Sequence, residues 1–452
     1  MQNMMNSLRT IFKSHSLVTW IACAYIFFSH VPRTTALVNL LSGAMLISWI
    51  FLAARKGFVL DWRSGLVRAY SCFFLVVLVG IVFSPYWQES LIPLRRELIP
   101  MTLAFVLLTA QRTVQEGKQQ RSVALLVAAS LISAFVVRTF LALVDWLKQG
   151  VENDFYSIDR AAAKFFDFYA TDASLIIPIV LAAILYLVMP RNLRLLLITS
   201  VVIGLVLVVV SSVRTAVVAT VIVTIAQLMP RFRSRKLWGL IAIALLSLAL
   251  TMVGTGRLEK VVDRYASIFS AASYEGNEAG VSSVYERLSI WKGTLEMVSD
   301  RPLFGYGLGW QKLYSVGYDN GYVANWRESP ALIDRTVARY FDAYEKGMVN
   351  PHNLWVDIVF ETGALGLISY VVMLCILLVR GIHALKQKSR DAVEHWFGGA
   401  TLAFLLAYGL VNMMGGFWLT SGATLTLLIV SELLSQRRIN LMRKLKVSKC
   451  AN

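Results

Sequence analysis

Long apolar runs separated by short polar gaps dominate the chain between Leu17 and Leu434. A helix needs about 20 apolar residues to cross roughly 30 Å of hydrocarbon, and about twelve runs are suited to this role. Their expected boundaries are residues 16–30, 36–54, 66–84, 93–110, 122–144, 172–189, 193–211, 213–229, 237–254, 353–379, 395–414 and 417–434. The pattern predicts an all-α polytopic membrane protein with about twelve transmembrane helices.

Two longer polar segments interrupt this pattern. Residues 145–171 are acidic and rich in aromatic side chains, and residues 255–352 form a long loop between spans nine and ten. The expected organisation is nine spans in residues 1–254, the large loop in 255–352, three spans in 353–434, and a basic tail in 435–452.

The large loop itself carries helical periodicity. The stretches SSVYERLSIWKGTLEMVSD and ALIDRTVARYFDAYEKG place apolar side chains at helical spacing. These side chains are Val284, Leu288, Trp291 and Leu295 in the first stretch, and Leu332, Val337, Tyr340, Phe341 and Tyr344 in the second. The glycine-rich stretch DRPLFGYGLGW between them predicts a turn. A structureless loop of this length is unusual, so we expect a helical loop with a function of its own.

The amount and placement of charged residues indicate what surrounds the protein and how the chain is oriented in the membrane. The chain is 57% hydrophobic and 16% charged, below the roughly 25% charged residues of soluble domains. Its net charge of +17 comes from Lys and Arg in alternate short gaps and in the tail. This positive-inside pattern indicates membrane lipids as surroundings and excludes a nucleic-acid binder. It predicts cytoplasmic termini and places both long polar segments on the outer side.

Among the five histidines, His352 alone combines an outer position with the start of a long helix. As the first or capping residue of span ten, His352 would face the positive end of the helix dipole. That dipole lowers the pKa of an imidazole and favours the neutral form needed by a general base. The alternative is that Pro351, His352 and Asn353 simply form a helix N-terminus with Asn353 as the cap.

Two arginines are candidates for binding phosphate. Arg214 lies in the tight outer hairpin SSVRT, and Arg287 lies on the first loop helix. A planar guanidinium suits bidentate contacts with a diphosphate. The alternatives are an interfacial anchor at Arg214 and a surface ion pair of Arg287 with Glu286 or Glu296.

Arg138, near the outer end of span five, is a further candidate, with neutralisation of Asp145 as its alternative. Four outer carboxylates have an irregular spacing that does not favour a divalent cation. They are Asp154, Asp159, Asp167 and Asp172. The glycine motifs of nucleotide enzymes are absent from the sequence. We therefore expect neither a metal nor a cofactor.

The two stretches RLSIWKGTLEMVSDRPLFGYGLGW and PHNLWVDIVFETGALGL resemble the core of the O-antigen ligase and polymerase superfamily, over roughly residues 200–380. The resemblance implies a GT-C type glycosyltransferase of the bacterial inner membrane. Such enzymes take a glycan from undecaprenyl diphosphate at the periplasmic face. In the ligase branch, the acceptor is the core oligosaccharide of lipid A. The essential arginines and histidine of that branch match Arg214, Arg287 and His352.

The resemblance also implies a mechanism. The expected reaction is a metal-independent, inverting transfer, with His352 as the base and Arg214 and Arg287 stabilising the diphosphate. Loop aromatics such as Tyr306 and Trp310 are suited to stacking on sugars, with no order among them. An O-antigen polymerase and a protein O-oligosaccharyltransferase are alternatives within the superfamily.

A lipid-linked glycan transporter is the alternative from another class. Transporters commonly show inverted repeats and charges near the membrane midplane. The chain has no internal repeat, and its distinctive residues gather at one face. Glu361 is the deepest acid of span ten, and it fits a paired structural residue better than a transport site.

Overall fold

The computed structural model describes residues 16–111, 117–148, 169–211, 213–229, 276–277, 280–281, 283–387, 391–415 and 422–450. Its first helices are α2 (Leu17–Ser29), α3 (Thr35–Ala54), α4 (Gly65–Val82), α5 (Trp87–Pro93), the π-helix η1 (Leu94–Leu98), α6 (Ile99–Thr109), α7 (Gly117–Lys148), α8 (Tyr169–Tyr186), α9 (Arg191–Val210) and α10 (Arg214–Leu228). The loop contributes α13 (Ser283–Val298), the short 3-10 helix η6 (Trp310–Lys312), α14 (Leu313–Asp319), α15 (Tyr322–Glu328) and α16 (Leu332–Ala343). The chain continues with α17 (Leu354–Lys386), α18 (Ala392–Asn412) and α19 (Gly422–Cys450).

These helices confirm the all-helical class. Helices lie at the expected positions of eleven spans, whereas the ninth expected span, 237–254, lies outside the described residues. Six of the described helices are long and apolar enough to cross a membrane, and three shorter ones are also apolar. Strands in the described chain are limited to the antiparallel pair β1 (Gly276–Asn277) and β2 (Gly280–Val281). The protein is therefore a multi-pass membrane protein, and the count of twelve spans stays a prediction.

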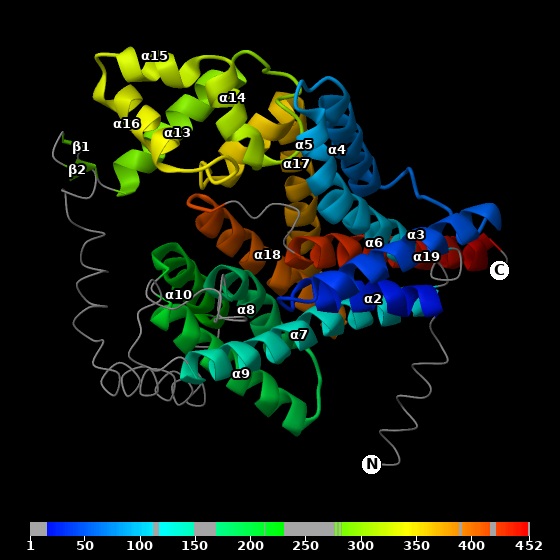
Figure 1. The fold of residues 1–452 in the computed structure, drawn as a ribbon. Coiled ribbons are helices and arrows are strands. Elements are labelled where there is room, and N and C mark those ends of the chain that lie inside the picture. The colour runs from blue at the N-terminus through cyan, green and yellow to red at the C-terminus, as the bar shows by residue number, and fades with distance from the viewer. Residues whose placement is uncertain are drawn as a thin grey trace.

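The spans pack around α17 and α18, which lie near the centre of Figure 1. The rings of Phe73 in α4 and Tyr370 in α17 lie 5.7 Å apart, and the Tyr370 and Tyr408 hydroxyls share a hydrogen bond of 2.6 Å. On the other side of α18, the Trp396 indole donates to the carbonyl of Ile179 in α8 at 3.3 Å. Aromatic side chains thus hold α4, α17, α18 and α8 together.

Residues 283–353 form a second unit, here named the loop module, at one end of the bundle (Figure 1). The module has its own apolar core, separate from that of the spans. This core includes Ile290, Met297, Leu313, Val316, Val323, Trp326, Val337, Phe341 and Val349. The expected loop helices are confirmed as α13 and α16. However, the Leu288 and Leu295 side chains of α13 are exposed, because Ile290, Thr294 and Met297 occupy the packed face.

The module docks on the helices through its glycine turn, defined as residues 302–309. Positive φ angles at Gly305, Gly307 and Gly309 confirm a turn in this stretch. The turn runs beside α17, where Tyr306 N donates to Phe360 O at 2.8 Å and Ala364 N donates to Pro302 O at 2.8 Å. Backbone-to-backbone hydrogen bonds therefore join two segments far apart in the sequence.

This contact requires glycine on both sides. Gly363 has φ 65° and ψ −169° and interrupts the helical geometry of α17. A β-carbon on Gly363 would lie 2.3 Å from the backbone of Leu303, and one on Gly305 would lie 2.5 Å from Phe360 O. No side chain fits at such distances, so the turn and the break in α17 interlock.

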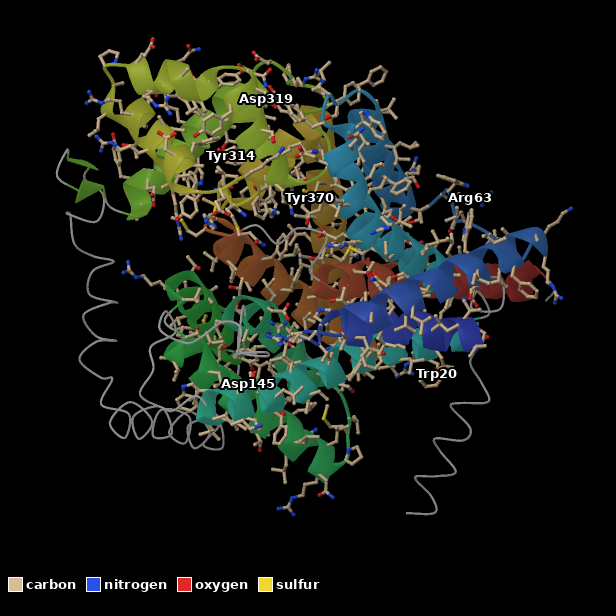
Figure 2. All side chains as sticks on the ribbon, in the orientation of Figure 1. Trp20, Arg63, Asp145, Tyr314, Asp319 and Tyr370 are labelled. Carbon is tan, nitrogen blue, oxygen red and sulfur yellow. The ribbon has the colours of Figure 1, made fainter. Side chains whose placement is uncertain are left out.

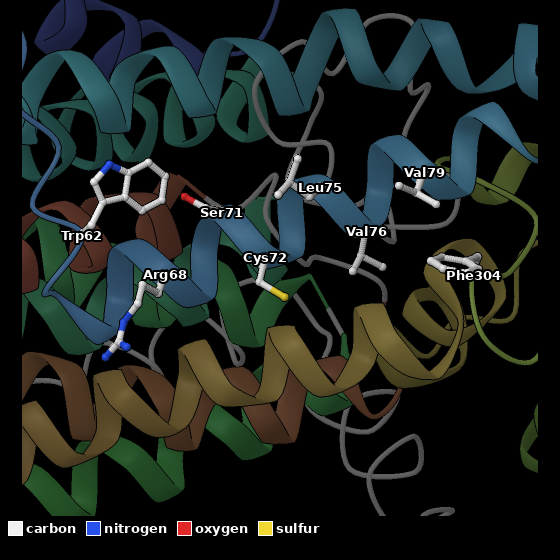
Figure 3. Close-up of a pocket in the computed structure, with 8 residues that line it drawn as sticks. All are labelled: Trp62, Arg68, Ser71, Cys72, Leu75, Val76, Val79 and Phe304. Atoms are coloured by element: carbon white, nitrogen blue, oxygen red, sulfur yellow. The ribbon is translucent and has the colours of Figure 1, made fainter.

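A groove along α4 lies on the surface of the spans (Figure 3). It is lined mainly by apolar atoms, with Phe304 of the glycine turn at one end. The lining residues are Trp62, Arg68, Ser71, Cys72, Leu75, Val76, Val79 and Phe304. None of the candidate site residues lines it, so this groove does not define the site.

Candidate active site

His352 lies just before α17, and Asn353 is the residue that caps this helix. The Asn353 side-chain oxygen accepts hydrogen bonds from Trp355 N at 2.9 Å and Val356 N at 3.2 Å. Its Nδ2 donates to Met413 O, after α18, at 3.2 Å. The expectation that His352 itself starts or caps the helix is therefore wrong, because the short Asn353 amide reaches the free N–H groups.

The backbone of His352 is held in a left-handed conformation with φ 52°. This region is uncommon for residues other than glycine, although histidine visits it more than most. Hydrogen bonds to His352 and to the two residues before it hold this conformation. His352 N donates to Asn350 Oδ1 at 2.6 Å, the Tyr340 hydroxyl donates to Asn350 O at 3.2 Å, and the Trp291 indole donates to Pro351 O at 2.7 Å. Backbone strain of this kind is typical of functional sites.

The imidazole of His352 is available for chemistry. Within the described chain, its ring nitrogens have no hydrogen-bond partner, and the residue keeps solvent-exposed surface. The surrounding protein nevertheless encloses the ring enough to weaken its hydration. This burial, and secondly the positive charge of Arg287, lower the pKa of His352 to about 4. The imidazole is therefore neutral at pH 7 and able to accept a proton.

Arg287 is thus brought together with His352 by the fold of the loop module. It lies on α13, one helical turn before Trp291, whose indole holds Pro351 beside His352. Its guanidinium also opposes the burial that raises the pKa of Glu286. Arg287 and His352 are 65 residues apart in sequence, and packing of α13 against α16 and α17 brings them into electrostatic range.

Arg214 is the first residue of α10 and is partly buried. The direction of the helices shows at which end of the bundle it lies. At one end, the Tyr186 ring of α8 stacks on His395 of α18, 6.4 Å between centroids. At the other end, α9 approaches the start of α8, since a β-carbon on Gly204 would lie 3.2 Å from the Tyr169 hydroxyl. The chain reaches Arg214 shortly after passing this second end.

The second end is also the end of His352. The helix α18 (Ala392–Asn412) carries His395 near its start and ends at Asn412, and Met413 O, just beyond it, accepts the hydrogen bond from Asn353. Arg214 therefore shares an end of the bundle with His352 but belongs to the spans, not to the module. In the described chain, no hydrogen bond or ion pair joins Arg214 to Arg287 or His352.

Arg138 is buried and engaged in an ion pair. Its guanidinium pairs with Asp172 of α8, also donates to His30 O at 3.5 Å, and lies 5.9 Å from the centre of the Tyr169 ring. Arg138 thereby joins α7 to α8 and to the end of α2. The other three candidate metal ligands, Asp154, Asp159 and Asp167, lie outside the described residues.

Glu361 has an internal positive partner in Lys312. Glu361 is 1% exposed, and the Lys312 ammonium beside it donates to Leu308 O at 2.8 Å, to Tyr306 O at 3.2 Å, and to the Ser90 hydroxyl. The charges of Glu361 and Lys312 interact, and the backbone N–H groups of Gly309 and Trp310 face the Glu361 carboxylate. The pair lies beneath the glycine turn. This arrangement agrees with a paired structural acid.

Sequence reasoning offered Asn353 as a possible helix cap, which the structure confirms, but it missed that Trp291, Tyr340 and Asn350 support His352. Trp291, Tyr340, Asn350 and Asn353 fix the backbone around it. The only available signal was the polar NPHN stretch, because asparagines beside a helix start commonly make turns and caps. Nothing local in the sequence pairs Trp291 with Pro351.

Comparison with known proteins identifies the region that holds this site. Residues 199–371 match the family model described as O-antigen ligase. The matched region contains Arg214, Arg287 and His352 together with the interlocked glycines. No curated protein matches the chain.

Proposed function

We propose that this chain, whose membership of the O-antigen ligase family is supported by the match over residues 199–371, is the ligase itself. It transfers O-antigen polysaccharide from undecaprenyl diphosphate to the lipid A–core oligosaccharide, at the periplasmic face of the bacterial inner membrane. The observation that carries the proposal is a neutral, conformationally fixed His352 within the electrostatic range of Arg287.

In this proposal His352 is the general base. The acceptor hydroxyl oxygen attacks the anomeric carbon of the donor sugar while the imidazole takes the hydroxyl proton. The bond from the anomeric carbon to the diphosphate oxygen breaks, and its electron pair leaves with the diphosphate. A single displacement inverts the anomeric centre. The left-handed backbone at His352 fixes the attachment point of the ring, which reduces the entropy lost on reaching the reactive geometry.

Arg287 and Arg214 stabilise the leaving diphosphate in this mechanism. Negative charge grows on the phosphate oxygens as the bond breaks, and guanidinium groups placed there lower the barrier electrostatically. Two guanidinium groups supply positive charge without a metal ion, and Arg138, engaged with Asp172, is left with a structural role. The diphosphate also offsets the charge of Arg287, so donor binding raises the pKa of His352 and makes it a stronger base.

The proposal also specifies how the chain is oriented in the membrane. The loop of residues 255–352, which includes the loop module, faces the periplasm, and both chain termini are cytoplasmic, as the distribution of basic residues favours. The prenyl chain of the donor and the acyl chains of lipid A remain in the bilayer. The reacting sugars meet at the end of the bundle where α17 and α10 begin.

The test uses purified full-length protein, an undecaprenyl-diphosphate-linked glycan and lipid A–core, with a chelator present. The matched variant is His352→Asn, because asparagine tolerates the left-handed backbone and cannot act as a base. We expect a glycan-bearing lipid A band from the unaltered protein and none from His352→Asn at equal thermal stability.

Two results would contradict the proposal. Lengthening of the glycan on its lipid carrier, with unmodified lipid A, would identify a polymerase. Full ligation by His352→Asn would remove the base from the mechanism.

A further inference from the structure

The aromatic side chains of the loop module differ sharply in their availability to a ligand. Tyr306 is 3% exposed, and its ring stacks on Phe360 with centroids 5.2 Å apart and planes 24° apart. Trp310 is partly buried at the start of η6. Within residues 283–353, Tyr344 is the only exposed aromatic residue, at 45%. Tyr344 is therefore the aromatic residue of the module that is open to a ligand, although helical spacing grouped it with the core residues Val337 and Phe341.

Local geometry explains this exposure. The helix α16 ends at Ala343, and Tyr344 continues in an extended conformation with φ −119° and ψ 145°. The chain thereby leaves the helical path that would have buried the ring, and Tyr344 instead lies against Tyr340. The two ring centres are 4.6 Å apart, and the planes are tilted by 45°. The buried Tyr340 ring thus supports the Tyr344 ring and leaves Tyr344 open to solvent.

The Tyr340–Tyr344 pair lies on the side of the module that carries the candidate site. Tyr340 is buried, and its hydroxyl donates to the carbonyl of Asn350, two residues before His352. The charges of Glu286 and Arg287 both act on this phenol. A ligand group that contacts Tyr344 is therefore close to the residue proposed to hold the diphosphate.

An exposed tyrosine ring in this position suits a sugar. The face of an aromatic ring carries partial negative charge, and one face of a pyranose presents C–H groups with partial positive charge. Within the described chain, the Tyr344 hydroxyl has no hydrogen-bond partner, so it is free for a sugar hydroxyl.

We propose that Tyr344 is the stacking platform for the donor sugar attached directly to the diphosphate. This inference rests on the proposed function. The donor sugar is favoured because Tyr344 packs against Tyr340, and Tyr340 lies within the electrostatic range of Arg287. Arg287 is the residue that the proposed function assigns to the diphosphate of the donor. Tyr344 would orient the anomeric carbon and does not take part in proton transfer.

Contact with the membrane surface is the competing role, because Leu288, Leu295 and Met348 are also exposed on the module. Leucine at position 344 separates the two roles. It keeps an apolar side chain that a lipid surface accepts, and it removes the aromatic face that a sugar requires. Phenylalanine keeps that face and removes only the hydroxyl.

The experiment measures equilibrium binding of two ligands to the full-length protein in detergent: undecaprenyl diphosphate without sugar, and undecaprenyl diphosphate carrying the glycan. We expect Tyr344→Leu to weaken binding of the glycan-bearing ligand about 3- to 10-fold, corresponding to one aromatic contact. Binding of the sugar-free ligand should stay within about twofold, and Tyr344→Phe should bind both nearly as the unaltered protein does.

Tyr314→Leu is the matched control. Tyr314, labelled on the module in Figure 2, forms a similar pair with Tyr318, with ring centres 4.5 Å apart, but is partly buried. It should leave both affinities unchanged.

Equal binding of the glycan-bearing ligand by Tyr344→Leu and the unaltered protein would overturn the stacking role. Equal weakening of both ligands would also overturn it, because Tyr344 would then contact the diphosphate or the prenyl chain. Failure of the unaltered protein to bind either ligand would instead refute the proposed function, and the inference with it.

Discussion

Replacing Gly363 by alanine tests whether the interlock between the glycine turn and α17 holds the module in place. Gly363 has φ 65° and ψ −169°, a conformation that alanine adopts only under strain. The added methyl group would lie 2.3 Å from the carbonyl carbon and oxygen of Leu303 and 2.5 Å from Phe304 N. These are backbone atoms, so relief requires the whole turn to move away from α17.

The expected cost follows from what that movement breaks. The hydrogen bonds from Tyr306 N to Phe360 O and from Ala364 N to Pro302 O would lengthen or break, at about 1 kcal/mol each. Backbone strain at Gly363 adds about 1–3 kcal/mol. The free energy of unfolding should therefore fall by about 3–5 kcal/mol, a large part of the stability of an ordinary domain.

Gly43→Ala is the control, because Gly43 lies within α3 and a β-carbon there would meet no atom within 4 Å. Alanine should be neutral or stabilising by up to about 1 kcal/mol at this helical position. Thermal unfolding of the detergent-solubilised protein, followed by tryptophan fluorescence, compares the two variants. We expect Tm to fall by several degrees in Gly363→Ala alone. Equal Tm values for the two variants would refute the interlock as a source of stability.

Two further predictions concern charge. In the proposed mechanism His352 acts as a base only when it is unprotonated, so kcat/KM should fall as the pH drops through about 4. Arg287→Gln should move this fall to higher pH, because it removes a positive charge that lowers the pKa of His352. An unchanged pH profile in the variant would contradict the electrostatic contact. Lys312→Met should destabilise the protein by about 3–5 kcal/mol because Glu361 would be left buried without its partner. The double variant with Glu361→Gln should recover part of that loss in a thermal unfolding series, and no recovery would show that the two side chains are not coupled.

Hydropathy predicted the positions of the helices because the bilayer imposes their length and composition. Helical spacing likewise predicted α13 and α16 within the loop. It did not predict which face of α13 is buried. Leu288 and Leu295 have the right spacing for a core, yet Ile290 and Met297 fill it. Periodicity constrains which residues share a face, whereas the neighbouring elements decide which face packs.

The candidate site was predictable in its residue types but not in its geometry. Chemistry and family resemblance pointed to His352 and Arg287, and their proximity depends on how the module folds. The hydrogen bond from Trp291 to Pro351 spans 60 residues and leaves no local trace in the sequence. Arg138 also pairs with Asp172 of the next helix, a tertiary contact that spacing along the sequence does not reveal.

The break at Gly363 also constrains how the protein is made. Backbone groups released by a helix break near lipid must find partners, since hydrocarbon offers none. The amide of Ala364 finds its partner in Pro302, which leaves the ribosome about sixty residues earlier. Synthesis from the N-terminus therefore delivers the glycine turn before α17 needs it. A fragment that starts at α17 would enter the membrane without that partner, so the chain should tolerate division elsewhere better than between the module and α17.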